Sequence, residues 1–524
     1  MSDAAARGPR RGFLVNTLWT WAAVVTSLAL ALLVTPLVIR RLGPDAYGLW
    51  VLVFSFTEYY SIVDLGVRSA VVKYVAQHTT LGETDELHRV LNTAFAYFGL
   101  GGVALLVFTL LIAPVVSGMF DVPPELRATS VHVLMATGAG VAATFAFMWL
   151  GASLEAIQRF DLSYRIMIGI NIARVAAMVA LLLLGFGLFA VVAIALAARL
   201  LQCVLVYRAF MRQFPGLHWS RQLVSRSTFR KLFGFSVFTL PSTAGAMLLE
   251  HGPGVIVGFA LPVAYVGYYN LPRRLLQSVL DLVHRMGSVT TARSAELAAR
   301  NDRAGLVRLA VQSNRYGLVV FMPATIFLWL FGEAVFRVWL TPQVAAISAP
   351  LLPIFLMGVV LADASQFNSS SMLYGLARHR VFGFLLLAEG LVSSALVYYF
   401  ARAGSLWHAA LAASALMIIN RGFLTPYLLC LHLQYSLVRY LADVSIRPLA
   451  SGVLAGAVMW GLKAAGLPVS SLLDLAMAGL LTTGVFALIA GRSCVLAEHR
   501  DWIVTLVARR APALVPATRA WLGG

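Results

Sequence analysis

A long stretch without charged side chains is the feature that most constrains this chain. Phe13 to Ile39 is a run of 27 residues that contains no Asp, Glu, Lys or Arg. About 20 apolar residues are enough for a helix to cross the hydrocarbon core of a bilayer. The run is also longer than the core of a signal peptide and ends in no small-residue cleavage pattern. We therefore expect it to be a retained membrane span.

Composition extends this expectation to the whole chain. Of its residues, 60% are hydrophobic and 12% are charged, whereas soluble domains carry about a quarter charged residues. The apolar runs are continuous rather than alternating, which argues against the strands of a membrane barrel. The sequence predicts an all-α integral membrane protein with about 14 transmembrane helices. Their expected ranges are 13–39, 48–68, 92–113, 129–151, 166–186, 187–207, 232–259, 263–286, 306–330, 349–372, 382–401, 405–430, 447–465 and 470–490.

The distribution of basic residues predicts the orientation. Most of the 40 Lys and Arg fall in loops on the side of the amino terminus. Because cytoplasmic loops are enriched in Lys and Arg, we expect both termini in the cytoplasm. This asymmetry also accounts for the net charge of +18 without nucleic acid as a partner. The three cysteines form no disulfide framework and are interpreted as packing residues.

The chain contains an internal repeat. The pattern Pro-x-Ala-Tyr occurs at 44–47 and again at 262–265, and similar pairs recur at an offset of 217 to 219 from the first span to the fourth. Each copy holds six predicted spans, an even number, so the copies should be parallel repeats. We therefore predict two six-helix lobes plus two C-terminal helices. The expected parts are an N-lobe at 1–211, a basic cytoplasmic linker at 212–231, a C-lobe at 232–432, helices 13 and 14 at 433–490, and a cytoplasmic tail at 491–524.

The linker, Arg212 to Phe233, mixes arginines with Leu217, Trp219 and Phe229. Such a pattern is typical of a basic helix that lies on the anionic inner leaflet. A solvated loop that follows the charge rule is an equally good interpretation of the same residues.

The stretch Leu33 to Gln77 carries a Leu-Gly-x-x-x-Tyr-Gly turn at 42–48 and an Asp-x-Gly turn at 64–66. With the arrangement of six, six and two spans, it resembles the polysaccharide transporter, or O-antigen flippase, branch of the multidrug/oligosaccharidyl-lipid/polysaccharide exporter superfamily. The segment Leu154 to Leu162 is similar to that branch's second inner loop. The resemblance implies two lobes around a central cavity, alternating access, and a lipid-linked oligosaccharide as cargo.

Charged residues inside spans are costly and mark a pathway by default. We expect a cationic cavity near the interface of the two repeats. Its candidate cargo-binding residues are Arg273, Arg274, Arg199 and Arg421, since arginine suits a pyrophosphate. The candidate coupling or gating residues are Glu250, Glu58, Asp64 and Asp281, with Gly252, Pro253 and Gly254 as a hinge. Adjacent arginines point about 100° apart on a helix, so one of the pair could instead bind Asp281 or Glu250.

No motif for catalysis, for a metal site or for a phosphate-binding loop is present. We expect a transporter without a cofactor, in which proton or sodium coupling stays open. Its partners would be the lipid-linked saccharide, membrane lipids, and a polysaccharide polymerase or export machinery. The alternatives are a peptidoglycan-precursor flippase or a multidrug/cation antiporter of the same superfamily. A membrane glycosyltransferase fits less well because the outer loops are short.

Overall fold

The computed structural model describes residues 9–234, 240–284, 287–364, 366–495, 504–505 and 515–522. Over this part of the chain every regular element is a helix. The chain divides into two compact units, Met1–Gly267 and Tyr268–Gly524.

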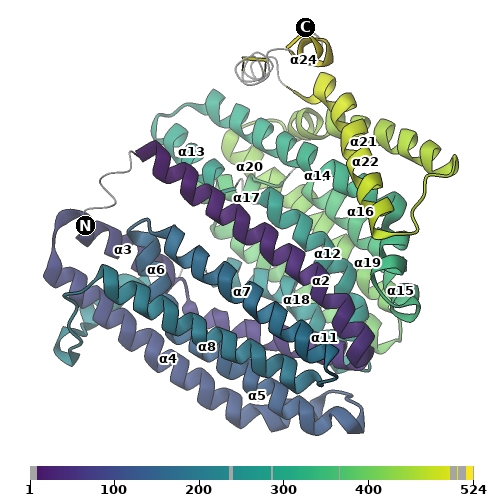
Figure 1. Cartoon of the computed structure of the whole chain (residues 1–524). Helices are drawn as coiled ribbons and strands as arrows, with labels where there is room; N and C mark the ends of the chain where they lie inside the picture. The colour runs from purple at the N-terminus through teal and green to yellow at the C-terminus, as the bar shows by residue number, and fades with distance from the viewer. Residues whose placement is uncertain are drawn as a thin grey trace. The chain divides into compact units, whose positions relative to one another are not determined.

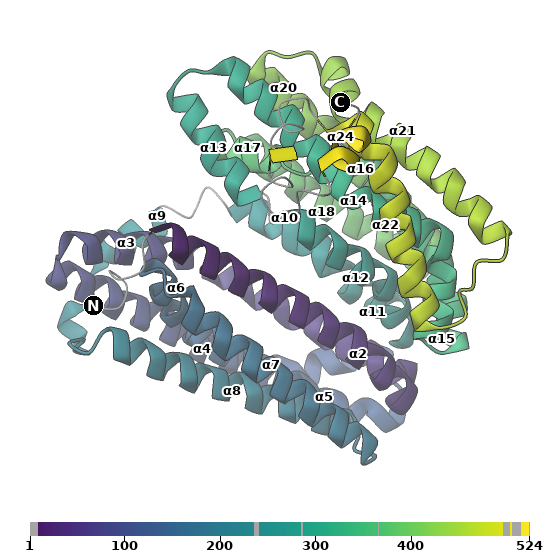
Figure 2. The ribbon, with the colours of Figure 1, turned by 45° about the horizontal axis from the view of Figure 1, so that its top comes forward.

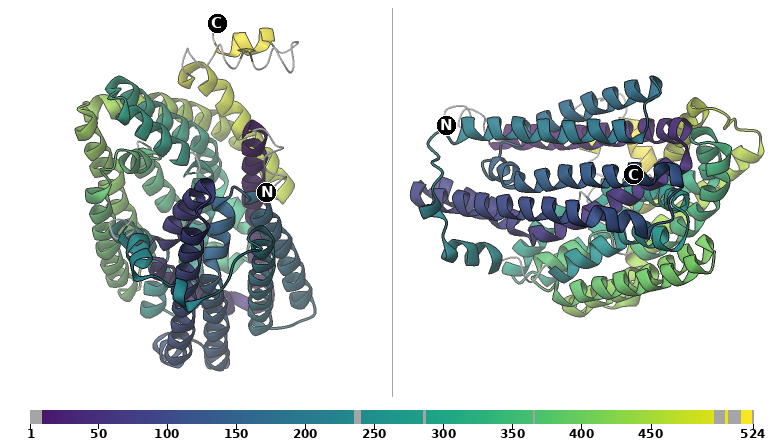
Figure 3. Two further views of the ribbon diagram at one scale, coloured as in Figure 1. Left: turned by 90° about the vertical axis from the view of Figure 1, so that its left-hand side faces the viewer. Right: turned by 90° about the horizontal axis from the view of Figure 1, so that it is seen from below.

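The first unit is a bundle of long helices (Figure 1). A kink at Gly43 divides its first helix, α2, because the backbone there has φ 85° and ψ 169°, which suits glycine. Helix α2 packs on α7, α7 packs on α8, and α5 lies between α4 and α8. Figure 3 shows these long helices running side by side. The elements are α2 (Pro9–Glu58), η1 (Tyr59–Asp64), α3 (Val67–Leu81), α4 (Thr84–Met119), α5 (Pro124–Ala146), α6 (Met148–Ala156), α7 (Phe160–Leu183), α8 (Leu188–Gln213), η2 (Arg221–Leu223), α9 (Arg226–Gly234), α10 (Leu240–Glu250) and α11 (Gly252–Ala260).

The second unit contains most of α12 (Ala264–His284), which begins in the first unit. Helices α14, α21 and α22 pack against one another (Figure 2), and α16, α18 and α19 form a second group around the π-helical segment η5. The remaining bounds are α13 (Gly287–Ala299), α14 (Arg303–Trp339), α15 (Pro342–Ser348), η4 (Ala349–Leu351), α16 (Leu352–Asp363), α17 (Ser369–Gly375), α18 (Arg380–Arg402), α19 (Leu406–Met417), η5 (Ile418–Leu424), α20 (Thr425–Leu433), α21 (Leu437–Ala464), α22 (Leu472–Cys494) and α24 (Val515–Leu522).

Ten helical segments of the described residues are long and apolar enough to cross a membrane. They correspond to ten of the predicted spans and confirm a multi-pass all-α membrane protein. The other four predicted ranges fall in α2, in α2 with η1 and the start of α3, in α9 to α11, and in α12. Residues 235–239 of the range 232–259 and residues 285–286 of the range 263–286 lie outside the described part. The count of 14 stays a prediction.

The internal repeat is visible in the backbone. Helices α4 and α14 begin 219 positions apart, and α7 and α18 end 219 positions apart. Three turns with positive φ recur at the same offset: Gly82 with Asn301, Gln158 with Ala377, and Gly185 with Gly404. Left-handed residues are uncommon, so three matched pairs are strong evidence for duplication. The predicted repeat is thereby confirmed, while the lobe boundaries drawn from sequence stay a prediction.

The two Pro-x-Ala-Tyr hairpins pack together inside the first unit. A Cβ atom on Gly48 would lie 2.0 Å from the carbonyl oxygen of Val263, and one on Gly267 would lie 2.8 Å from the ring of Tyr47. Real Cβ atoms do not approach so closely, so both positions require glycine as they are packed. The repeated motif therefore forms a tight backbone contact.

Candidate functional site: charged groups within the helical segments

Arg199 lies on α8 and lines a small pocket with Phe54, Thr137 and Gly140. Its guanidinium carbon is 6.0 Å from the centre of the Phe54 ring, a distance at which a cation–π attraction operates. A Cβ on Gly140 would come 3.0 Å from Cδ of Arg199, so this glycine leaves room for the arginine stem. No described acid lies within ion-pair distance of Arg199. It therefore keeps an uncompensated positive charge inside the helix bundle.

Arg421 has the opposite environment. Its Nε atom is 3.2 Å from Oε1 of Glu389, a carboxylate on α18 whose residue is 5% exposed. Asn420 donates its side-chain amide to the other oxygen of Glu389 at 2.6 Å. Glu389 thus neutralises the guanidinium, and the cargo-binding role of Arg421 stays a prediction.

A second buried acid stands near this pair. Asp363, at the end of α16, is fully buried and interacts electrostatically with Arg421. Its Oδ1 accepts a hydrogen bond from Gln366 at 2.6 Å, while no described residue hydrogen-bonds to its Oδ2. Glu389 pairs directly with the guanidinium, and Asp363 adds a longer-range electrostatic attraction. The acids and the arginine come from three elements, α16, α18 and η5.

Helix α12 carries the predicted arginine pair. Arg273 is half-buried, and its guanidinium carbon lies 5.8 Å from the centre of the Tyr269 ring. Arg274 is exposed and makes no ion pair with a described residue. Asp281 accepts a hydrogen bond from Gln277, its neighbour one turn away, at 2.9 Å. A pair between Asp281 and either arginine, one of the expected arrangements, is not formed.

The predicted hinge falls at a helix break. Helix α10 ends at Glu250, α11 begins at Gly252, and the buried Pro253 occupies the first turn of α11, where proline is well tolerated. The side chain of Glu250 is 60% exposed, and its Oε2 lies 4.0 Å from Nε2 of His251. The centre of the His251 ring lies 6.3 Å from that of Tyr59, the residue that follows Glu58 in the chain. The structure shows the helix break. Hinge motion at this break and a coupling role of Glu250 stay predictions.

Asp64 serves the backbone. The turn after η1 places Leu65 and Gly66 in the left-handed region, and Oδ1 of Asp64 accepts the backbone N–H of Arg68 at 3.0 Å. The Arg68 side chain in turn pairs with Glu155 of α6 at 2.5 Å. These contacts fix the entry to α3, so a structural role of Asp64 stands beside its predicted coupling role.

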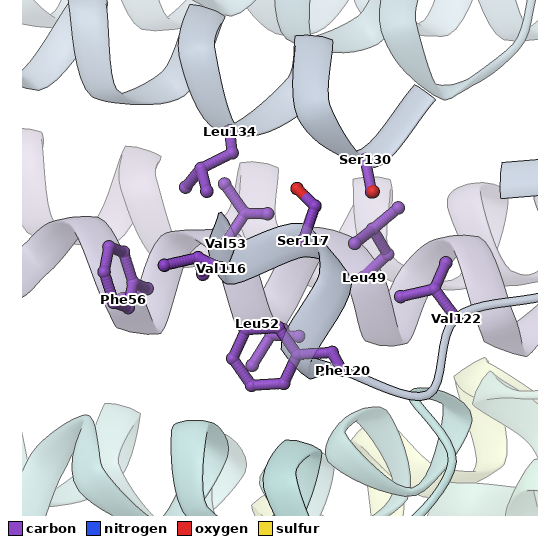
Figure 4. Close-up of a pocket in the computed structure, with 10 residues that line it drawn as sticks. All are labelled: Leu49, Leu52, Val53, Phe56, Val116, Ser117, Phe120, Val122, Ser130 and Leu134. Carbon is purple, nitrogen blue, oxygen red and sulfur yellow. The ribbon is translucent and has the colours of Figure 1, made fainter. Parts of the chain in front are cut away.

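The first unit also contains an apolar pocket (Figure 4). Leu49, Leu52, Val53 and Phe56 of α2 face residues of α4 and α5 across it. Its remaining lining is Val116, Ser117, Phe120, Val122, Ser130 and Leu134. None of these lining residues is charged.

Sequence reasoning missed three charged residues within spans: Asp363, Glu389 and Arg315. Arg315 of α14 is 6% exposed, and its Nε donates to the backbone carbonyl of Asp443 at 2.8 Å. The signal was present, since each is a charged residue within a predicted apolar span. Buried charge therefore extends beyond the candidate residues that the sequence singled out.

Known proteins are similar in sequence to this chain. The family model described as polysaccharide biosynthesis protein matches residues 37–349. A putative O-antigen transporter of Shigella flexneri is 20% identical over 77% of this chain and 95% of its own length. The uncharacterized membrane protein EpsK of Bacillus subtilis (strain 168) is 22% identical over 65% of this chain and 67% of its own.

Solved structures share the fold. The lipid II flippase MurJ in an inward closed conformation covers 94% of this chain, over all of its own length, with a TM-score of 0.68 and 15% identity. An inward-facing multidrug resistance transporter of the MATE family covers 78% of this chain and 99% of its own, with a TM-score of 0.65 and 12% identity. At these identities the likeness concerns the fold alone.

Proposed function

Because the chain belongs to the polysaccharide biosynthesis protein family, we propose that it moves lipid-linked oligosaccharides from the inner to the outer leaflet of the bacterial cytoplasmic membrane by alternating access. The family match over residues 37–349 carries this proposal. The similarity to a putative O-antigen transporter along 95% of that protein supports the same cargo class. The chain would act as a transporter and not as an enzyme, with both termini in the cytoplasm.

The arginines within the helices support an anionic cargo. Arg199 and Arg274 have no acid within ion-pair distance among the described residues, so each can meet the phosphates of a lipid-linked saccharide. Arginine binds phosphate through two parallel hydrogen bonds. We assign cargo binding to Arg199, Arg273 and Arg274. Arg421 is a weaker candidate for cargo binding because Glu389 compensates its charge.

An organic cation, the expected cargo of a multidrug extruder, would be repelled by the same arginines. A peptidoglycan-precursor flippase remains the second candidate, since the MurJ fold covers 94% of the chain. The absence of arginine between Phe13 and Ile39 disfavours it, because that family carries arginines in its first span. In this proposal, transport is coupled to protons or sodium through Glu250 or Glu58. The chain also cooperates with a polysaccharide polymerase.

Purified protein in vesicles tests this assignment. A fluorescent oligosaccharide attached to a lipid through pyrophosphate should cross the bilayer faster than in protein-free vesicles. Losing a charge-assisted hydrogen bond costs about 1.5–3 kcal/mol, so Arg199→Gln and Arg274→Gln should each slow transfer about tenfold or more. Arg→Lys variants should recover part of the rate because they keep the charge.

Arg439→Gln is the matched control, since Arg439 is exposed near the start of α21. It should transport at the normal rate. Melting curves of each variant separate lost transport from lost folding. Full transport by a folded variant lacking both Arg199 and Arg274 would refute the cationic pathway, and no transfer by the unchanged protein would refute the cargo.

A further inference from the structure

The segment that follows α8 is a docked part of the first unit rather than a free loop. Leu217, Thr228 and Leu232 are buried. Asn92 of α4 holds the segment at two points: its amide donates to the carbonyl of His218 at 3.1 Å and its oxygen accepts the N–H of Ser220 at 2.9 Å. Such paired backbone bonds from a buried side chain fix the segment in one place.

Aromatic contacts fix the position of this segment along the apolar surface of α4. Trp219 packs on Phe95, with ring centres 4.7 Å apart, and lies 5.5 Å from the ring of Trp149. Phe95 belongs to a helix long and apolar enough to span a membrane and is 49% exposed. It therefore faces lipid near the first turns of that span. Trp219 itself is 39% exposed, and tryptophan favours the headgroup region at such a level.

The side of the segment that faces away from the bundle is basic. We define the basic linker surface as Arg221, Arg226, Arg230 and Lys231. All four are exposed, and none forms an ion pair with a described residue. Residues 208–234 include no Asp or Glu. Exposed Val224 and Phe229 stand among the cations, the combination that suits a membrane surface.

We propose that the basic linker surface binds the headgroups of anionic phospholipids and holds the segment in the interface of the membrane. Three observations carry the proposal: the fixed docking on α4, the contact with a lipid-facing ring, and the uncompensated charge. Juxtamembrane cations are attracted to anionic lipid within about a Debye length of the surface. The lipid is bound here independently of any transported saccharide.

The test uses the full chain in vesicles that contain only phospholipids. Cys203, Cys430 and Cys494 are buried, so a fluorophore can be placed selectively at the exposed position 222 in a Gln222→Cys variant. Lipids brominated near the headgroup quench a fluorophore that lies in the interface. Quenching by brominated phosphatidylglycerol should exceed quenching by brominated phosphatidylcholine about twofold or more at equal mole fraction, and the ratio should fall in high salt.

Two sets of substitutions in the labelled protein decide the cause. Replacing Arg221, Arg226, Arg230 and Lys231 with Gln should bring the ratio to one. The control replaces four exposed arginines from other segments, Arg308, Arg378, Arg380 and Arg439, and should leave the ratio unchanged. Equal quenching by both lipids in the labelled parent overturns the proposal. A quenching ratio that falls as far in the control variant as in the linker variant overturns it too. Quenching by neither lipid would show that the surface faces solution or a protein.

Discussion

At the scale of single residues, the Glu389–Arg421 pair gives the sharpest stability prediction. Removing one partner of a buried ion pair leaves the other charge uncompensated and costs about 3–5 kcal/mol. We expect Glu389→Gln and Arg421→Gln each to lower the melting temperature clearly. The double variant should lose less than the sum of the two, because neither member of the Glu389–Arg421 pair is then left without the other. Thermal unfolding of purified protein in detergent measures all three, and additive losses would contradict the pairing.

Gly48 supplies a second prediction at this scale. Its missing side chain lets α2 meet the backbone of Val263, and a Cβ there would lie 2.0 Å from the carbonyl oxygen. Gly48→Ala should therefore destabilise the protein by about 1–3 kcal/mol through overpacking. Gly99 is the control: it lies within α4 with nothing within 4 Å of an added Cβ. Gly99→Ala should stabilise the helix slightly. Equal melting temperatures for the two variants would disprove the tight contact.

At the scale of elements, Asn92 joins α4 to the segment that follows α8. Asn92→Ala would leave the carbonyl of His218 and the N–H of Ser220, both in partly buried hydrogen bonds, without their partner, at up to about 1–3 kcal/mol each. The segment should then open more often, and trypsin should cut at Arg221 or Arg226 about tenfold faster or more. Limited proteolysis followed by mass spectrometry gives the rate.

Asn92→Asp keeps the acceptor for Ser220 and loses the donor to His218, so its cleavage rate should be intermediate. Cleavage of the alanine variant at the parent's rate would mean that these bonds do not hold the segment.

At the scale of the whole molecule, the repeat could be predicted because a duplicated chain retains matching residues at a nearly constant offset. Pro-x-Ala-Tyr at 44–47 and 262–265 has an offset of 218, and the turns at Gly82 and Asn301 lie 219 apart. The environment of each arginine could not be predicted. Met417, and not Arg421, stands 218 positions after Arg199, and Gly358 packs on Met417 as Gly140 packs on Arg199.

The pairing of Arg421 depends on the π-helical turn η5 and on a contact with α18 about 30 residues earlier in the chain. Neither leaves a local pattern. The docking of the linker on α4 likewise rests on Asn92, more than a hundred positions before Ser220. The sequence did not predict this docking and left a basic helix on the inner leaflet and a solvated loop equally open. Long-range side-chain contacts decide both, and periodicity carries no information about them.

We propose that this chain carries lipid-linked saccharides across the cytoplasmic membrane. The most direct measurement deletes the protein in its host and determines, by lipid mass spectrometry and side-selective labelling, which lipid-linked saccharide accumulates and on which leaflet. A lipid-linked repeat unit of a polysaccharide should build up on the inner leaflet and disappear when the chain is restored. If no such lipid accumulates, or if it accumulates on the outer leaflet, the proposed transport step is contradicted.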